Sequence, residues 1–220
     1  MLLFAAADIH GNHDVYDWLV DVIALERPDA VVLAGDLLGC PGDCDAVEEA
    51  QAVERQEVLG QLSQIQPPMY YVMGNDDWIE LQSPVSSQLS IHGKRVDSGE
   101  YNFVGYQNTL PFMGGINEKP EVEIEKDLAL IAPKIDEATV LVTHGPAYGT
   151  LDLATVDRHA GSLSLRDLVR RRSPRLHIHG HIHGQFGRSG RHFNVASGGK
   201  KRAMLLDVAK MSHRLVEGTA

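Results

Sequence analysis

Residues 2–12, LLFAAADIHGN, give the first indication of the fold class of this chain. It starts as a short, continuous apolar run, which is typical of a buried strand, and it ends in a polar cluster that contains Asp8, His10 and Asn12. The residues that follow have apolar side chains at helical spacing: Val15, Trp18, Leu19, Val22 and Ile23. The chain therefore begins with a strand and an amphipathic helix.

The same alternation continues to about residue 73. AVVLA (30–34) and MYYVM (69–73) predict two more buried strands, and residues 45–66 between them predict a helix. One side of that helix is expected to be apolar, and it carries Val47, Ala50, Val53, Val58, Leu62 and Ile65. A β-α-β-α-β order implies a parallel sheet with right-handed crossovers.

The second half mixes both kinds of pattern. Residues 89–107 contain short β-like pieces separated by glycines, which predicts antiparallel hairpins. Helices are expected over 121–132 and 162–172, and strands over 138–143, 175–180, 192–197 and 203–208. With no repeat or linker visible, we expect one α/β domain over residues 1–220 with mixed sheets.

Composition narrows the function classes. The net charge of −10 gives no basic surface for a nucleic-acid backbone, so no stable nucleic-acid binding is expected. Cys40 and Cys44 are interpreted as free thiols of a reducing compartment. The N-terminus matches neither a signal peptide nor a membrane span, and no other apolar run is long enough to cross a bilayer. We expect a soluble, cytoplasmic protein without a membrane partner.

Polar clusters follow five of the predicted strands, each beside a glycine. They are Asp8-Ile9-His10-Gly11-Asn12, Gly35-Asp36, Gly74-Asn75-Asp76-Asp77, Thr143-His144-Gly145-Pro146 and Gly180-His181-Ile182-His183. Any one of them is explained as a turn, a helix cap or a surface histidine. Ligands of open α/β sheets gather beyond the carboxyl ends of the strands, so five clusters in order predict a shared site.

The side chains in these clusters suit a pair of metal ions. The candidate ligands are two aspartates, an asparagine and four histidines: Asp8, His10, Asp36, Asn75, His144, His181 and His183. Oxygen and imidazole ligands without thiolate favour Mn, Fe, Zn, Co or Ni. Seven ligands are too many for one catalytic ion, but they fit two ions about 3.5–4 Å apart that share a carboxylate. Such a pair would leave a local positive charge for a phosphate in an otherwise acidic protein.

In this order, D-x-H, G-D, G-N-x-D, H-G-P and G-H-x-H resemble the calcineurin-like metallophosphoesterase family, in its small bacterial and archaeal phosphodiesterase-like branch. The resemblance implies two mixed β-sheets packed as a sandwich flanked by helices, with a dinuclear centre at the strand ends. Carried over by position, the first ion would bind Asp8, His10, Asp36 and His183. The second would bind Asp36, Asn75, His144 and His181, which makes Asp36 the bridge.

The implied activity is hydrolysis of P–O bonds in a small phosphate ester by a metal-activated hydroxide. Manganese is expected first, with iron, zinc, nickel or cobalt as alternatives. One position departs from the family, because GNDD places Asp76 where a histidine is common. An ionised Asp76 cannot donate a proton and repels a monoester dianion more than a diester, which favours a phosphodiesterase. An Asp76 that keeps its proton could still act as an acid.

Other residues near these clusters are candidates for catalysis or substrate binding. Beside Asn75 and Asp76, His13 is a candidate catalytic residue, and Asn12 and His159 are candidates for substrate binding. His177 and His179 are expected to be structural or to support ligands, and His92, His192 and His213 to lie on the surface. Tyr148 and the loop 111–115 could shape a pocket, although core packing is the preferred interpretation.

Three alternatives remain open from the sequence. The first is a protein or nucleotide phosphomonoesterase of the same family. The second is a non-catalytic scaffold, and the third is a metal-binding regulator without turnover. The seven filled ligand positions argue against the scaffold. The oligomeric state and the natural substrate have no signal in the sequence.

Overall fold

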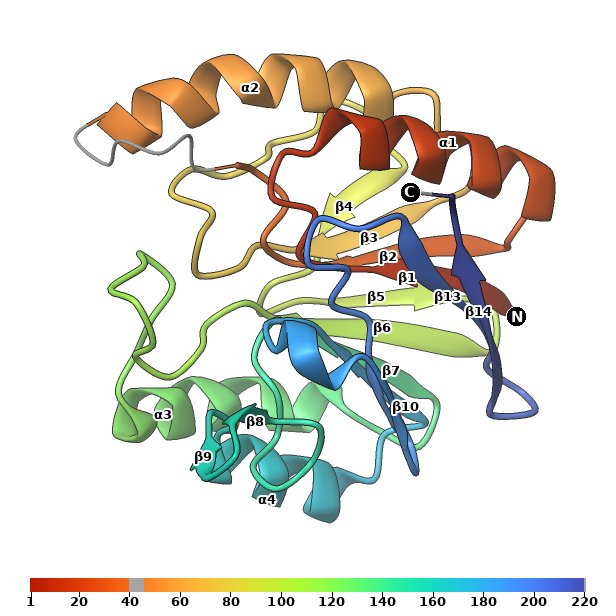
Figure 1. Cartoon of the computed structure of the whole chain (residues 1–220). Helices are drawn as coiled ribbons and strands as arrows, with labels where there is room; N and C mark the ends of the chain where they lie inside the picture. Colours follow the sequence, from red (N-terminus) through yellow and green to blue (C-terminus); the bar gives the residue numbers. More distant parts are fainter. Residues whose placement is uncertain (40–45, 220) are drawn as a thin grey trace.

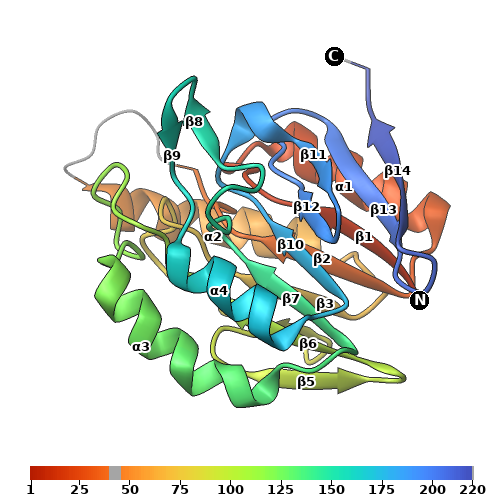
Figure 2. The ribbon, with the colours of Figure 1, turned by 90° about the horizontal axis from the view of Figure 1, so that it is seen from below.

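The computed structural model describes residues 1–39 and 46–219, and within them two six-stranded mixed sheets face each other (Figure 1). The first sheet has the order β14-β13-β1-β2-β3-β4, and the second has the order β11-β12-β10-β7-β6-β5. Helices α1 and α2 cover the outer face of the first sheet, and α3 and α4 cover that of the second (Figures 1 and 2). This confirms the predicted fold class.

The first sheet is built on the β-α-β-α-β unit at the start of the chain. Its parallel strands are β1 (Leu2–Ala6), β2 (Ala30–Ala34), β3 (Met69–Val72) and β4 (Gln88–Ser90). The connecting helices are α1 (His13–Glu26) and α2 (Val47–Leu62). The C-terminal strands β13 (Arg202–Asp207) and β14 (Ser212–Glu217) add antiparallel at the β1 edge.

The second sheet has a parallel centre with an antiparallel strand at each edge. Its centre consists of β6 (Tyr101–Tyr106), β7 (Thr139–Thr143), β10 (Leu176–His179) and β12 (His192–Asn194). The edges are β5 (Arg95–Ser98) and β11 (Gly187–Ser189). Helices α3 (Glu121–Ile131) and α4 (Leu163–Arg172) pack outside, and a separate hairpin, β8 (Leu153–Thr155) and β9 (Arg158–His159), follows β7. Two 3-10 turns, η2 (Ala132–Lys134) and η3 (His183–Gln185), complete the elements.

Strand residues alternate between two apolar layers. In β1, Leu3 and Ala5 point between the two sheets, whereas Phe4 and Ala6 point toward α1 and α2. All four side chains are fully buried, which explains the continuous apolar run at this position. The result is a rigid frame in which strands from both sheets end along one edge of the molecule.

Most predicted elements are confirmed, with local exceptions. The segment 89–107 contains the antiparallel β5–β6 pair, but β4 is parallel to β3 and belongs to the other sheet. Val53 was expected on the buried side of α2, and it is 70% exposed. Cys40 and Cys44 lie outside the described residues. No helix in the described ranges combines the length and the apolar character that a membrane crossing requires.

His192 corrects the expectation of a surface histidine. β12 pairs with β10, and this register puts His192 directly beside the buried His177, with their Nδ1 atoms 2.9 Å apart. The Thr143 hydroxyl donates to the carbonyl of Gly145, so it accepts a hydrogen bond from Nε2 of His177 at 2.8 Å. Nδ1 of His177 is then the acceptor for His192. Both imidazoles are held neutral, as expected for structural histidines.

The neutral pair predicts a loss of stability in acid. Burial, followed by the charge of Arg191, lowers the pKa of His192 to about 4. Since the ordinary pKa is near 6.5, the unfolded state binds the proton first as the pH falls, and the folded state loses stability between about pH 6.5 and pH 4. Over this window, the free energy of unfolding of the wild type should fall by about 1–2 kcal/mol more than that of a His192→Gln variant.

Urea unfolding at pH 7 and pH 4.5 measures this difference. A His213→Gln variant, changed on the exposed strand β14, should retain the pH dependence of the wild type. Equal losses in the wild type and in His192→Gln would show that His192 does not keep a neutral imidazole in the folded protein.

Candidate metal centre

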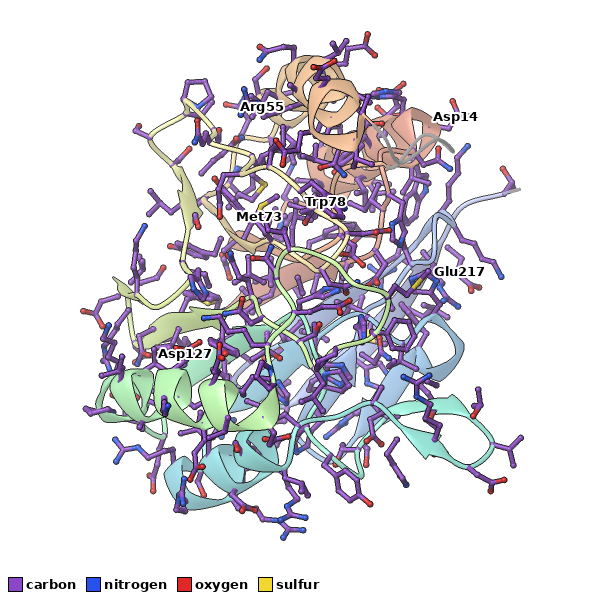
Figure 3. All side chains as sticks on the ribbon, turned by 90° about the vertical axis from the view of Figure 1, so that its left-hand side faces the viewer. Asp14, Arg55, Met73, Trp78, Asp127 and Glu217 are labelled. Carbon is purple, nitrogen blue, oxygen red and sulfur yellow. The ribbon has the colours of Figure 1, made fainter. Side chains whose placement is uncertain are left out.

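The seven predicted ligands come together at the carboxyl ends of the strands, which form the left-hand edge of Figure 1 and face the viewer in Figure 3. Four of these residues have a left-handed backbone, with φ of 56° at Asp8, 51° at His10, 51° at Asp36 and 70° at His181. Side chains other than glycine rarely adopt this conformation, and where they do, function is a frequent reason. The chain therefore turns sharply at these ligand positions after β1, β2 and β10.

The first group consists of Asp8, His10 and His183, whose ligand atoms lie within 4.8 Å of one another. Nε2 of His183 is 3.1 Å from Oδ1 of Asp8 and 3.3 Å from Nε2 of His10. The backbone N–H of His181 donates to both carboxylate oxygens of Asp8, at 3.1 and 3.0 Å, and fixes its orientation. Two ring nitrogens and a buried carboxylate thus point at one small volume.

The second group consists of Asp36, His144 and His181, and Asn75 joins it. Nδ1 of His144 donates to the backbone carbonyl of Ala34 at 2.9 Å, so its Nε2 carries a lone pair in the neutral tautomer. That lone pair faces Oδ1 of Asn75 at 3.0 Å and Oδ2 of Asp36 at 3.2 Å. In this neutral form three acceptor atoms converge without a donor, an arrangement that fits a bound cation.

The charges in the site lead to the same conclusion. Burial alone would lower the pKa of His10 and His144, but the surrounding carboxylates, Asp76 for His10 and Asp36 for His144, raise the two values to about 9 and about 10. Burial opposes ionisation of Asp36, yet the His144 charge outweighs it and lowers its pKa. His181 is different, since burial and then the charge of His144 lower its pKa to about 3. Without a metal, the carboxylates therefore favour the protonated, positively charged forms of His10 and His144.

Two glycines, Gly74 and Gly180, have no side chain at the places where the carboxylates of Asp36 and Asp8 lie. A Cβ at Gly74 would collide with the side chain of Asp36, and a Cβ at Gly180 would collide with Oδ2 of Asp8. Neither glycine is in the left-handed region, so their role is close approach rather than backbone freedom.

A Gly180→Ala substitution should therefore displace the carboxylate of Asp8. We expect metal affinity to fall by roughly 10- to 100-fold, which is the effect of disturbing groups that orient ligands. Titration calorimetry with Mn²⁺ measures the change. Gly184→Ala is the matched control, because a Cβ at Gly184 meets nothing within 4 Å. Unchanged affinity in Gly180→Ala would mean that Asp8 does not need this position to bind an ion.

Asp77 has a structural role that was not predicted from the sequence. This side chain is 1% exposed and accepts the backbone N–H groups of Leu37, Leu38 and Gly74 at 2.7–2.8 Å. Burial and the neighbouring Asp36 raise its pKa to about 8. Asp77 thus ties the turn after β2 to the turn after β3. The signal in the sequence was the position of Asp77 at the end of GNDD, two residues after Asn75 and next to Asp76, which faces the cavity.

Gln51 and Glu54 on α2 hold the same loops from the other side. Gln51 is fully buried, donates to the carbonyl of Asp76 at 2.7 Å and accepts from the N–H of Trp78 at 2.8 Å. Met73, just before this turn, lies in the core beneath α1 and α2 (Figure 3). Glu54 accepts the N–H of Gly39 at 2.5 Å. Gln51 and Glu54 both lie in the helix that the sequence predicts over residues 45–66, where only the apolar side was expected to make contacts.

A cavity of about 380 Å³ opens directly over the metal-ligand groups. Its wall includes His10, Asp36, Asn75, Asp76, Phe112, Met113, Ala154, His181, Ile182, His183 and Gly184. Core packing was the preferred interpretation of the loop 111–115, and it is wrong, because Phe112 is only partly buried and Met113 is 81% exposed. The Phe112 ring meets His181 edge-on with centroids 4.7 Å apart.

The structure places the other candidates outside this wall. Nδ1 of His13 is 2.9 Å from Gln61 of α2. Asn12 caps α1 by accepting the N–H of Val15 at 3.3 Å, and it donates to the carbonyl of Gly199 at 3.1 Å. His159 binds the buried Asp152 at 2.8 Å. His179 lies fully buried in β10, and its Nε2 has no hydrogen-bond partner among the described residues.

The family model described as calcineurin-like phosphoesterase matches residues 1–185. The chain belongs to this family. Calcineurin-like phosphoesterases typically bind two divalent metal ions, and the two ligand groups described above provide candidate positions for them. No curated protein matches the sequence.

Solved structures show the fold of this calcineurin-like phosphoesterase at low sequence identity. One crystal structure is similar with a TM-score of 0.80, 17% identity and 99% coverage of both chains. The protein TT1561 of Thermus thermophilus has a TM-score of 0.74 and 16% identity, with 98% of each chain covered. A dimetal phosphatase from Danio rerio has a TM-score of 0.63 and 14% identity, with 100% of this chain and 99% of that chain covered.

Proposed function

We propose that this protein is a metal-dependent phosphodiesterase that hydrolyses small phosphodiesters. The supporting observation is the position of Asp76 at the cavity wall, where its side chain is 40% exposed and its Oδ2 lies 3.4 Å from Nδ1 of His10. A carboxylate at this place repels the second negative charge of a monoester. A diester carries only one charge and meets less repulsion.

Seven side chains would hold the ions in this proposal. Asp8, His10, Asp36 and His183 would bind the first, and Asp36, Asn75, His144 and His181 would bind the second. When bound, two divalent ions lower the pKa of a water molecule and offset charge on phosphoryl oxygens. Manganese is our first choice, because the ligand set is oxygen and imidazole without thiolate.

The protein groups prepare the site for this chemistry. The hydrogen bond from His144 to Ala34 would present Nε2 to the ion, and Asp76 would orient His10 in the same way. Asn75 would add a neutral amide beside the phosphate. The frame of strand ends and backbone hydrogen bonds fixes all of these groups before substrate arrives.

Side-by-side assays of two esters with one leaving group test the proposal. The Mn²⁺-loaded protein should hydrolyse bis-p-nitrophenyl phosphate with a higher kcat/KM than p-nitrophenyl phosphate. Asp76→His adds a potential proton donor and removes a negative charge, so it should raise the relative rate on the monoester by roughly 10-fold or more. Asp76→Asn removes the charge alone and separates the two effects.

A wild-type preference for the monoester would contradict the proposed diesterase activity. Absence of turnover on both esters by fully metal-loaded protein would favour the scaffold or the metal-binding regulator.

A further inference from the structure

Two segments that follow strands of the second sheet contribute apolar side chains to the cavity wall. One is the loop 111–115, which presents Phe112 and Met113, and the other is the β8–β9 hairpin, which presents Ala154. Both project from the second sheet on the same side of the molecule (Figures 1 and 2). None of the seven candidate metal ligands comes from either segment, so metal binding does not explain why the two segments lie at the cavity.

The loop 111–115 is held rigidly by one carboxylate. Glu118 accepts the backbone N–H groups of Phe112, Met113 and Gly114 at 2.8–2.9 Å. Gly115 also packs against the backbone carbonyl of Asn75, where a Cβ would collide. The loop therefore presents Phe112 in a fixed place next to a metal-ligand position.

The hairpin has a similar anchor in Asp152, which is 1% exposed. Its carboxylate accepts the N–H groups of Gly149 and Gly161 at 3.0 and 3.2 Å and binds Nδ1 of His159 at 2.8 Å. The hydrogen bond to Asp152 gives His159 a structural role, so its position does not require a role in substrate binding. It also fixes the neighbouring Arg158 on the side of the hairpin that faces Phe112.

Arg158 and Phe112 meet across the two loops. The guanidinium carbon of Arg158 lies 5.3 Å from the centroid of the Phe112 ring, and the edge of the same ring contacts His181. Arg158 is exposed and has no ion pair with any residue that the structure describes. An aromatic ring and a free, planar cation are the groups that stack on planar rings of ligands.

We propose that Phe112 and Arg158 bind a planar aromatic group of the substrate, so that the substrate is a phosphodiester with a nucleobase or a similar aryl ring. This inference rests on the phosphodiesterase function proposed above and adds the substrate class. Phe112 supplies the apolar surface for the ring, and Arg158 supplies the stacking cation. Phe112 belongs to the cavity wall, and Arg158 lies against its ring from the hairpin.

Competitive inhibition by two matched ligands tests the inference. Thymidine 5′-monophosphate and 2-deoxyribose 5-phosphate share the phosphate and the sugar and differ in the base. Each is used as an inhibitor of bis-p-nitrophenyl phosphate hydrolysis. The nucleotide loses the stacking of its base in Phe112→Leu, so its inhibition constant should rise by roughly 10-fold, whereas that of the sugar phosphate should not change. Arg158→Gln should act in the same direction.

Arg188→Gln is the matched control. Arg188 is also exposed, and its guanidinium also lies 5.3 Å from an aromatic ring, but that ring belongs to Phe193, which is not part of the cavity wall. This variant should behave as the wild type does. Equal inhibition by both ligands in the wild type, or an equal loss for both in Phe112→Leu, would overturn the inference.

A binding readout separates this inference from the proposed function. In saturation-transfer NMR with the metal-free protein, the base protons of thymidine 5′-monophosphate should receive more saturation from the wild type than from Phe112→Leu. If bis-p-nitrophenyl phosphate is not hydrolysed but this difference is present, the phosphodiesterase proposal fails and the aromatic site remains. If hydrolysis occurs and the difference is absent, the aromatic site fails alone.

Discussion

Asp36→Asn is expected to lower the proposed phosphodiesterase activity at least about 100-fold. Changes to groups that only orient metal ligands cost about 10- to 100-fold, and Asp36 is itself a proposed ligand. Oδ2 of Asp36 faces Nε2 of His144 at 3.2 Å, and an amide nitrogen in its place would donate a hydrogen bond to the lone pair meant for an ion. Both ions would also lose an anionic ligand. The measurement is kcat/KM on bis-p-nitrophenyl phosphate with saturating Mn²⁺.

The fold of this variant should be intact. The remaining oxygen can still accept the N–H of Asp76, which now donates to Oδ1 at 2.8 Å. Asp97→Asn provides the control, because Asp97 lies on the edge strand β5 with 74% of its side chain exposed. Activity within a few-fold of the wild type in Asp36→Asn would show that Asp36 does not bridge two ions.

Asp77→Ala is expected to lower the free energy of unfolding by about 3–5 kcal/mol, the largest effect on stability among these changes. Three backbone N–H groups, those of Leu37, Leu38 and Gly74, would lose their acceptor inside the protein. Urea unfolding of the metal-free protein measures this loss independently of metal binding. Because the same bonds hold the turns of Asp36 and Asn75, metal affinity should fall as well.

Asp77→Asn separates the three hydrogen bonds. Its single oxygen can keep the N–H groups of Leu37 and Leu38, which both bind Oδ1, whereas the amide nitrogen would face the N–H of Gly74. Asp77→Asn should therefore lose less free energy of unfolding than Asp77→Ala. A change below about 1 kcal/mol in Asp77→Ala would mean that water or a rearranged turn replaces the carboxylate.

The sequence predicted the sheet centres and the shared site because both leave strong local signals. A strand buried on both faces reads as a continuous apolar run, as in β1 and β2, and parallel strands bring their carboxyl ends to one edge. Asp8, Asp36 and His144 could therefore be placed in one site without coordinates. Their roles as ligands stay predictions until an ion is observed.

Other parts of the structure depend on contacts that no local pattern encodes. The polar strand β14 is largely exposed and forms only by pairing with β13, so it lacks an apolar alternation. Gln51 lies in a helical segment rich in charges, and only the fold shows that it binds the turn after β3. Likewise, nothing local to Phe112 shows that Glu118 turns its loop toward the cavity.

Anomalous diffraction from crystals of the Mn²⁺-loaded protein can show whether two ions bind to the seven side chains. We expect two anomalous peaks per chain, about 3.5–4 Å apart, with Asp36 bound to both. Asp8, His10 and His183 should surround one peak, and Asn75, His144 and His181 the other. A single peak, or peaks away from these side chains in a fully loaded protein, would contradict it.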